Sequence, residues 1–301
     1  MVLAKMATAE LCLAPTSAAP YFLLLPDPLV SEVLKLLRAV DLAMLAATCR
    51  GFRRMAEETA EGELAERHRT TGVNARVPAV PGPGEGWCQL LHQLECIDAP
   101  LCFARLHPYL TIAEGGGSAL KSGPGAGYDT CCTGAVMRAG VHCAVFTLVR
   151  YNGDIIVGIC SADFDPTGAA CATSTNSGWG FGASNGHLYH GDVSGGVPWE
   201  GTRYGPSGAA VSGDKIGFVL DCDEGSLTMF LNSVRLGVLA HFEPGTRLRW
   251  ISELYFGGDC VRISSSTQAG ILRESNKSSY FAGGTGLANH SGSAWIQPVL
   301  E

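Results

Sequence analysis

The sequence predicts a mainly β protein in which an antiparallel β-sandwich follows a small all-α segment. Charged residues make up only 16% of the 301 residues, and glycine is unusually frequent at 39. This combination favours many tight turns over long solvated helices. From Leu101 onward the apolar residues recur with a period close to two, and turn residues return about every 8 to 12 positions, which is typical of a sandwich. Residues 101–264 are therefore expected to form the sandwich.

The preceding residues show helical periodicity instead. Residues 1–20 are alanine-rich without a sustained period and are expected to be a flexible leader. Asp27 and Pro28 predict a helix start, because aspartate caps helices and proline is tolerated in the first turn. Asp41 predicts a second start, and Gly51 is expected to separate that helix from a third. The first helix has apolar residues at helical spacing, namely Leu29, Val33, Leu34, Leu36 and Leu37.

The predicted helices of residues 21–76 form a unit too small to be stable on a core of its own. Their apolar face is therefore expected to pack against another surface, either a partner or the sandwich. Residues 56–76 are rich in Glu and Arg and are expected to continue as a solvated helix. Residues 77–100 are expected to hold a linker, VPAVPGPGEG, and a short helix. Residues 265–301 form a Ser/Gly-rich tail, expected to be partly disordered, with a segment able to dock back at Ala294, Trp295 and Ile296.

Turn residues predict the order of strands in the sandwich. Asn152-Gly153 separates two β-branched and aromatic runs, 141–149 and 155–160, and predicts a hairpin between them. Residues 222–225 predict a second hairpin, and Asn232-Ser233 predicts a turn into a further strand. A three-strand meander is expected at Lys215–Asp221, Ser226–Leu231 and Val234–Leu239, and a last strand at Cys260–Ile263.

Charge and cysteine content narrow the classes of function. The formal charge is -7 and no cluster of Lys and Arg occurs, which argues against a nucleic-acid partner. The apolar run 21–25 is too short for a signal sequence or a membrane span. The twelve cysteines include no C-x-x-C pair, so buried free thiols are expected and no metal site. The adjacent Cys131 and Cys132 should point to opposite faces of a strand. A cytoplasmic and/or nuclear protein is expected.

Motifs for nucleotide, calcium or covalent chemistry are incomplete. Residues 115–122, GGGSALKS, lack the second glycine of a phosphate-binding loop, because Leu120 stands there. The acidic run from Asp221 to Glu224 lacks the glycine of a calcium loop, whose position is Ser226. No Gly-x-Ser-x-Gly elbow or cysteine-nucleophile signature occurs. The sequence therefore predicts a protein that is not an enzyme, with no catalytic residues and no cofactor.

The stretch Gly213–Gly225, GDKIGFVLDCDEG, and the residues after it resemble the signature of SPRY domains. Val157-Gly158 and Gly178-Trp179-Gly180 resemble other parts of that signature. The resemblance extends over roughly residues 101–264 and implies a bent antiparallel β-sandwich that recognises proteins without catalytic residues. Much of the signature has a structural explanation, because its glycines suit turns and its aromatic residues suit a core.

One subgroup of SPRY domains, those with a SOCS box, binds short peptides at one end of the sandwich. Here the resemblance implies target binding by Pro124, Ala126, Tyr255, Phe256 and Gly257. The arginine position of the subgroup is Ser122 in this sequence, and its loop tyrosine position falls near Gly168 in a shorter segment. Two polar contacts of the subgroup are therefore missing, and its peptide motif is not expected to be the ligand.

Residues 25–55 are similar to an F-box, from Leu25-Pro26-Asp27-Pro28-Leu29 to Phe52-Arg53-Arg54-Met55. F-boxes dock onto the Skp-type adaptor of cullin-RING ubiquitin ligases. The resemblance implies adaptor binding by Leu25, Pro26, Leu29, Val33, Leu34, Leu37 and Leu42.

Taken as a pair, the two resemblances imply the substrate-recognition subunit of a cullin-RING ligase of the SCF type. Its partners would be a Skp-type adaptor, a cullin, and a protein or peptide target of the SPRY loops, with neither nucleic acid nor membrane involved. The alternative is a SPRY-domain scaffold or adaptor whose N-terminal helices are structural and which has no ligase role.

Overall fold

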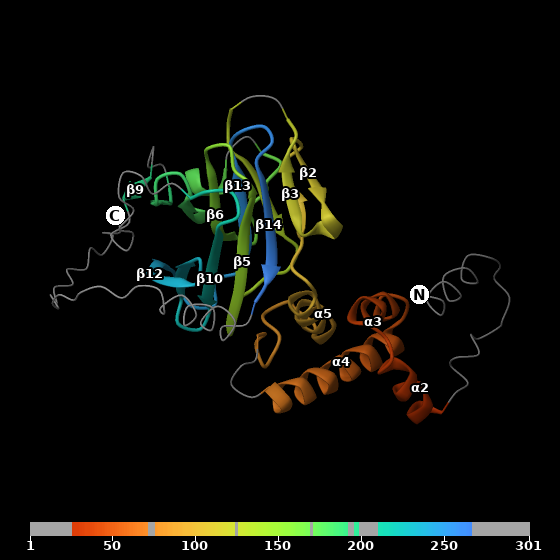
Figure 1. Cartoon of the computed structure of the whole chain (residues 1–301). Helices are drawn as coiled ribbons and strands as arrows, with labels where there is room; N and C mark the ends of the chain where they lie inside the picture. Colours follow the sequence, from red (N-terminus) through yellow and green to blue (C-terminus); the bar gives the residue numbers. More distant parts are fainter. Residues whose placement is uncertain are drawn as a thin grey trace.

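The computed structural model describes residues 26–71, 76–123, 126–168, 171–191, 196–198 and 210–266. In these ranges helices come first and strands follow, as Figure 1 shows. The strands form two antiparallel sheets that face each other, so the predicted mainly β sandwich with preceding helices is confirmed.

Each sheet has seven strands in the described residues. The first sheet, sheet A, has the order β1 (Phe103–Leu106), β4 (Asp129–Thr133), β13 (Leu248–Leu254), β6 (Ile155–Ser161), β7 (Gly178–Gly182), β8 (His187–Tyr189) and β9 (Val197–Pro198). The second sheet, sheet B, has the order β12 (Val234–His241), β11 (Ser226–Leu231), β10 (Lys215–Asp221), β5 (Val141–Arg150), β14 (Cys260–Ser265), β3 (Ser118–Lys121) and β2 (Leu110–Ala113).

Large aromatic residues fill the space between the sheets. Side chains on a strand point alternately to its two faces, so every second residue of β5 is buried. Phe146 of that strand meets Phe218 with ring centroids 5.9 Å apart, and Trp250 lies 6.2 Å from Phe218. None of these three side chains is more than 1% exposed, so they form the centre of the sandwich core.

The hairpin predicted at Asn152-Gly153 is wrong, because the turn carries the chain from one sheet to the other. β5 pairs with β10 and β14 in sheet B, whereas β6 pairs with β13 and β7 in sheet A. The Asn152 backbone N–H donates to Asp259 at 2.8 Å, and its side chain donates to the Gly257 carbonyl at 3.1 Å. These bonds join the turn to the one between β13 and β14 and leave it at a corner of the sandwich.

The meander predicted from residue 215 onward is confirmed. β10 pairs with β11 from Ile216↔Leu231 to Asp221↔Ser226, and β11 pairs with β12. Asn232 and Ser233 have φ angles of 46° and 71°, the left-handed pair that a two-residue hairpin turn needs. The last predicted strand is also present, as β14.

The helices form a unit with its own small core. They are α2 (Asp27–Leu34), α3 (Ala39–Ala46), α4 (Arg50–Thr71) and α5 (Trp87–Asp98). The predicted caps are wrong: Pro26 precedes α2 and Arg38 precedes α3, while Asp41 lies in the first turn of α3. Gly51 lies inside the first turn of α4 and does not separate helices. α4 is also less solvated than predicted, because its inner face is buried at Ala56, Ala60 and Leu64.

Glutamate side chains accept hydrogen bonds at the N-termini of α3 and α5. Glu95 of α5 accepts a hydrogen bond from the backbone N–H of Ala39 at 3.0 Å, where α3 begins. Glu57 of α4 accepts bonds from the N–H groups of Trp87 and Cys88, where α5 begins. A carboxylate at a helix N-terminus satisfies free N–H groups and is stabilised by the helix dipole. Residues that are distant in sequence therefore hold α3, α4 and α5 together.

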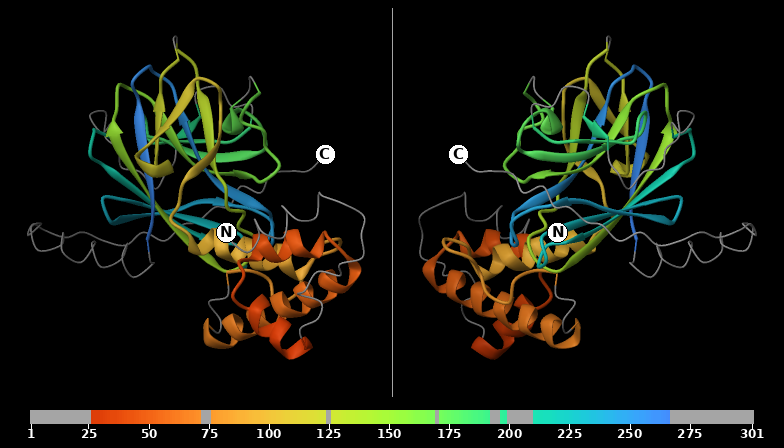
Figure 2. Two further views of the ribbon diagram at one scale, coloured as in Figure 1. Left: turned by 90° about the vertical axis from the view of Figure 1, so that its right-hand side faces the viewer. Right: turned by 90° about the vertical axis from the view of Figure 1, so that its left-hand side faces the viewer.

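The helical unit lies against one end of the sandwich, as the two opposite views of Figure 2 show. Ala135, from the chain after β4, packs into the helix core. Arg138 pairs with Glu85 of the linker, and both side chains are largely buried, at 16% and 13% exposed. Glu85 in turn accepts hydrogen bonds from Gln93 at 2.6 Å and from the Gly82 N–H at 2.9 Å. This polar cluster ties linker, helix and sandwich to one another.

The eleven described cysteines are all free thiols. Cys131 lies in the core between the sheets, whereas Cys132 lies on the outer face of sheet A with its Sγ 3.8 Å from that of Cys160. The two neighbours thus point to opposite faces as predicted. Burial is less general than expected, because Cys49 and Cys102 are exposed. None of the described helices combines the length and apolar character needed to cross a bilayer.

Candidate interaction surfaces

Aromatic residues gather at the end of the sandwich that lies away from the helices. The turn between β13 and β14, at the top of Figure 1, carries Tyr255 and Phe256. Tyr255 packs edge-on against Tyr128 and Phe256, with ring centroids 4.8 Å and 4.7 Å apart. Phe256 is 39% exposed and Tyr109 is 49% exposed. We call Tyr109, Ala126, Tyr128, Tyr255, Phe256 and Gly257 the recognition end.

Asp259 fixes the turn that presents Phe256. Its buried carboxylate accepts hydrogen bonds from the backbone N–H groups of Asn152 and Phe256, both at 2.8 Å. Burial raises the pKa of Asp259, although the backbone hydrogen bonds act in the opposite direction. Gly153 has a φ of 149°, and a Cβ there would lie 3.0 Å from the Phe256 ring. A glycine at this position therefore allows the aromatic side chain to rest across the neighbouring turn.

A buried ion pair holds the two ends of the loop that leads to Tyr128. Lys121, the last residue of β3, has its Nζ 2.8 Å from Asp129, the first residue of β4. The Lys121 side chain is 2% exposed and that of Asp129 is 9% exposed. His107 lies on the other carboxylate oxygen at 2.9 Å, and Lys121 also donates to the Gly127 carbonyl. The loop between the two strands thus starts and ends on paired charges.

Asp154 orients Tyr128. Its carboxylate accepts hydrogen bonds from the Tyr128 hydroxyl and, at 2.8 Å, from Ser184. Burial and the hydrogen bond to Asp154 both raise the pKa of Tyr128 well above its ordinary range. The phenol therefore stays neutral and fixed, with its ring against Tyr255.

The structure brings most of the predicted target-binding residues together. The Gly127 N–H donates to the Tyr255 carbonyl at 3.3 Å, so the Ala126 loop lies beside the aromatic turn. Ala126, Phe256 and Gly257 are exposed and Tyr255 is half-buried, while Pro124 lies outside the described residues. Sequence reasoning missed Tyr128 and Asp154, which immediately precede β4 and β6. Only Asp154 had a signal in the sequence, because it directly precedes a predicted strand.

The helical unit presents a second apolar surface. Leu29 and Leu36 are 54% and 85% exposed, and they lie seven positions apart, with half-buried Val33 between them. Val40 and Met44, one turn apart on α3, are 39% and 51% exposed. Together with Pro26, which is exposed ahead of α2, we call these apolar residues of α2, α3 and the turn between them the helical face. Among the described residues, none covers these apolar side chains.

The predicted adaptor-binding residues divide between this face and the helix core. Pro26, Leu29 and Val33 belong to the helical face. Leu34 and Leu42 are 0% and 1% exposed inside the helical unit, and Leu37 packs against the same core. Leu25 lies outside the described residues. The regular apolar spacing alone could not separate the two groups, because inward and outward leucines alternate on these short helices.

Residues 22–58 match the family model of the F-box domain. The match contains α2, α3 and the first part of α4, and it includes every residue of the helical face. It confirms the F-box resemblance of the sequence.

Three solved structures similar to this chain are SPRY domains, the family that the signature stretch resembles. The SPRY domain of human HERC1 is 18% identical, covering 55% of this chain and 99% of its own, with a TM-score of 0.44. The PSpry domain of TRIM65 is 14% identical, with 58% and 98% covered and a TM-score of 0.40. A human SPRY domain is 18% identical, with 52% and 94% covered and a TM-score of 0.40. A search of curated proteins gave no match.

Proposed function

We propose that this chain is the substrate-recognition subunit of an SCF-type cullin-RING ubiquitin ligase. The F-box segment, within residues 21–76, binds a Skp-type adaptor and through it a cullin. The sandwich of residues 101–264 binds a protein or peptide target at the recognition end, and residues 77–100 join the two. The subunit catalyses nothing itself; it raises the local concentration of target lysines near the ligase machinery. The proposed setting is cytoplasmic or nuclear, in keeping with the free thiols.

The observation that carries the proposal is the placement of two apolar surfaces at opposite ends of the molecule. The helical face lies within the F-box match, and the recognition end lies at the far end of the sandwich (Figure 1). Exposed apolar side chains in such groups mark interaction sites. Two partners can therefore bind the chain at once without sharing a surface.

Aspartate substitutions of exposed residues test the proposed binding of the adaptor. Leu36→Asp and Met44→Asp place a charge on the helical face without touching the helix core, whereas Leu34→Asp would unfold it. Val80→Asp is the matched control, since Val80 is 66% exposed and lies outside the F-box match. We expect both helical-face variants, but not the control, to lose recovery of a purified Skp-type adaptor at unchanged circular dichroism. Failure of the unaltered chain to recover adaptor, where a reference F-box succeeds, would overturn the assignment.

The proposed binding of a target is tested with Phe256→Ala. Mass spectrometry compares the proteins captured by this variant with those captured by the unaltered chain. Val80→Ala is the matched control, because Val80 is 66% exposed and lies in the linker, outside the recognition end. Exposed aromatic anchors often carry much of an interface's affinity. We expect specific captures to be lost from the Phe256 variant alone; captures that survive it rule out this end of the sandwich as the target site.

One observation favours the alternative of a scaffold without a ligase role. The helices bury a core that includes Ala135 of the sandwich and are joined to it by the Glu85–Arg138 pair, as a purely structural unit would be. The two functions separate in the adaptor experiment. A scaffold would retain its target captures while never recovering adaptor, with or without the helical-face substitutions.

A further inference from the structure

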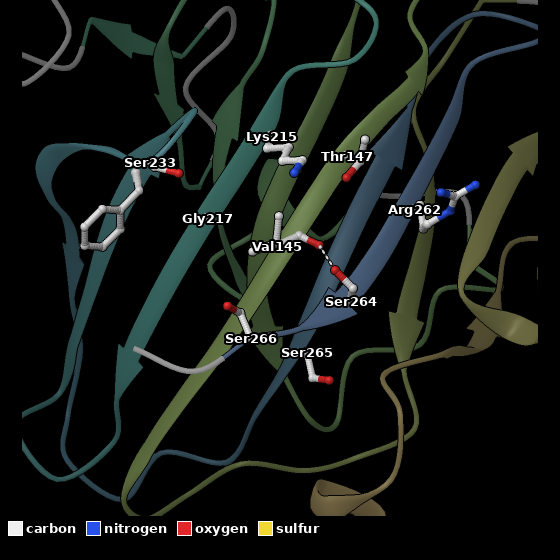
Figure 3. Close-up of a pocket in the computed structure, with 10 residues that line it drawn as sticks. Val145, Thr147, Lys215, Gly217, Ser233, Arg262, Ser264, Ser265 and Ser266 are labelled. Atoms are coloured by element: carbon white, nitrogen blue, oxygen red, sulfur yellow. Dashed lines mark hydrogen bonds between the residues drawn. The ribbon is translucent and has the colours of Figure 1, made fainter. Parts of the chain in front are cut away.

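The outer face of sheet B carries a hollow that neither interaction surface uses. It has a volume of about 310 Å³ and lies over β10, β5 and β14 (Figure 3). In the sheet register Lys215 pairs with Thr147, which pairs with Arg262, and these three side chains form one row across the three strands. The next row on this face is Gly217, Val145 and Ser264.

Gly217 is the cause of the hollow. It has no side chain, so the face is open between its cross-strand neighbours Phe230 and Val145. Phe230 belongs to a small apolar cluster on this outer face and not to the core between the sheets. Phe230 and Val145 are therefore the apolar side chains beside this opening, and the other side chains that line the hollow are polar. Lys215 and Arg262 give its rim two positive charges, and Thr147 and Ser264 add hydroxyl groups.

We propose that this hollow binds the segment of the same chain from Ala294 to Glu301. The described chain ends at Ser266, which itself lines the hollow, so the remaining residues leave the sandwich at this site. The 27 residues from 267 to 293 then connect it to the segment. A polar, glycine-containing chain of that length has an average reach of about 30 Å, and such a tether gives a millimolar local concentration.

The chemistry of the segment complements that of the hollow. Its sequence, AWIQPVLE, is mostly apolar, and its one charged side chain is Glu301. Trp295 offers a flat ring for the open space above Gly217, between Phe230 and Val145. The carboxylate of Glu301 is opposite in charge to Lys215 and Arg262. Apolar filling with a charge of the right sign at the rim is how small concave sites fix an occupant.

Hydrogen–deuterium exchange of the full chain tests the proposal without adaptor or target present. We expect backbone amides of residues 294–301 to exchange about tenfold more slowly in the unaltered chain than in Lys215→Glu. Lys215 is exposed, so the substitution leaves the sandwich folded. The double variant Lys215→Glu with Glu301→Lys should restore the slow exchange, because it reverses both charges. Arg247→Glu is the matched control, since Arg247 is 55% exposed and lies outside the hollow.

Three results would overturn the proposal. Exchange of residues 294–301 at the rate of an unstructured peptide in the unaltered chain would mean that the segment does not dock. Slow exchange that Lys215→Glu leaves unchanged would place it elsewhere. Slow exchange that grows with protein concentration would mean that a second copy supplies the segment. Because no adaptor or target takes part, these results are independent of the ligase assignment.

Discussion

The helical unit and the sandwich bury their apolar residues in different ways. The sandwich core contains fully buried aromatic residues such as Phe146, Phe218 and Trp250, and it is closed by its own two sheets. The helix core is made mainly of alanines and leucines, and its alanines let the helices approach closely but bury little apolar area each. The sandwich closes its core with its own sheets, whereas the helices of the F-box match need additional contacts.

Those additional contacts come from outside the F-box match. The match ends at residue 58, inside α4, and the core is completed by α5 and by Ala135 of the sandwich. The small size of the predicted unit indicated that its apolar face must be covered. Part of the cover turns out to be the chain's own α5, and the helical face is what stays exposed. The apolar residues of the F-box segment therefore divide into two groups. One group is buried in the helix core, and only the other group, the helical face, is open to a partner.

The largest expected effect is in the sandwich. Trp250→Ala should lower the free energy of unfolding by about 3–5 kcal/mol, because the removed indole leaves a cavity between Phe146 and Phe218. Urea unfolding followed by circular dichroism measures the change. Val149→Ala, on the outer face of β5, should cost under about 0.5 kcal/mol. A loss for Trp250→Ala as small as that of the control would show that the sandwich does not depend on this core.

The buried pair at the recognition end should rank next. Lys121→Met leaves the Asp129 carboxylate buried without its main partner, and we expect a loss of about 3 kcal/mol in unfolding free energy. The double variant Lys121→Met with Asp129→Leu should recover most of the loss, since no unpaired charge remains. Urea unfolding of the three proteins measures both steps. A double variant less stable than the single one would mean that the ion pair itself, and not the avoided unpaired charge, stabilises the loop.

The success of sequence reasoning differed between the regions for a physical reason. In the sandwich, local turn chemistry identified the meander, because Asn232-Ser233 adopts left-handed φ angles that few residues accept. The same logic failed at Asn152-Gly153, where the turn is local but the partners of β5 and β6 are chosen by tertiary packing. Both strands are apolar enough to pair with either sheet, and the bonds from Asn152 to Asp259 and Gly257 span more than a hundred positions.

In the helical region, periodicity identified helices but not their ends or exposure. Asp27 and Asp41 were predicted as caps from residue type alone. In the structure α3 begins on a bond from Ala39 to Glu95, which is 56 positions away and invisible to local rules. The resemblance assigned Ala126 and the aromatic turn to one end of the sandwich, and the structure places them side by side. Tyr128 and Asp154 were missed because their roles depend on one hydrogen bond between distant loops.

The junction between the two regions gives a smaller, pH-dependent effect. Burial alone would raise the pKa of Glu85, but hydrogen bonds from Gly82 and Arg138 and the positive charge of Arg138 lower it below its ordinary value of 4.5. Since the folded-state pKa is depressed, the stabilisation is present above about pH 4.5 and is lost as the pH falls through the folded-state value. Glu85→Gln should therefore cost about 2 kcal/mol near neutral pH, and the difference from the unaltered chain should shrink toward about pH 3. Urea unfolding at several pH values measures this; a difference that is constant with pH would contradict it.

The smallest expected effect on stability is at Phe256, and it is the sharpest test of the division between core and surface. Tyr255 and Phe256 are adjacent, but the Tyr255 ring packs between Tyr128 and Phe256, while Phe256 is the more exposed of the two. Phe256→Ala should change the unfolding free energy by less than about 1 kcal/mol, whereas Tyr255→Ala should cost more because it removes a packed neighbour of Tyr128. Thermal unfolding of both variants ranks them. If Phe256→Ala proves the more destabilising, its side chain supports the turn and is not held ready for a partner, and the recognition end would then have to be centred on Tyr109 and Ala126.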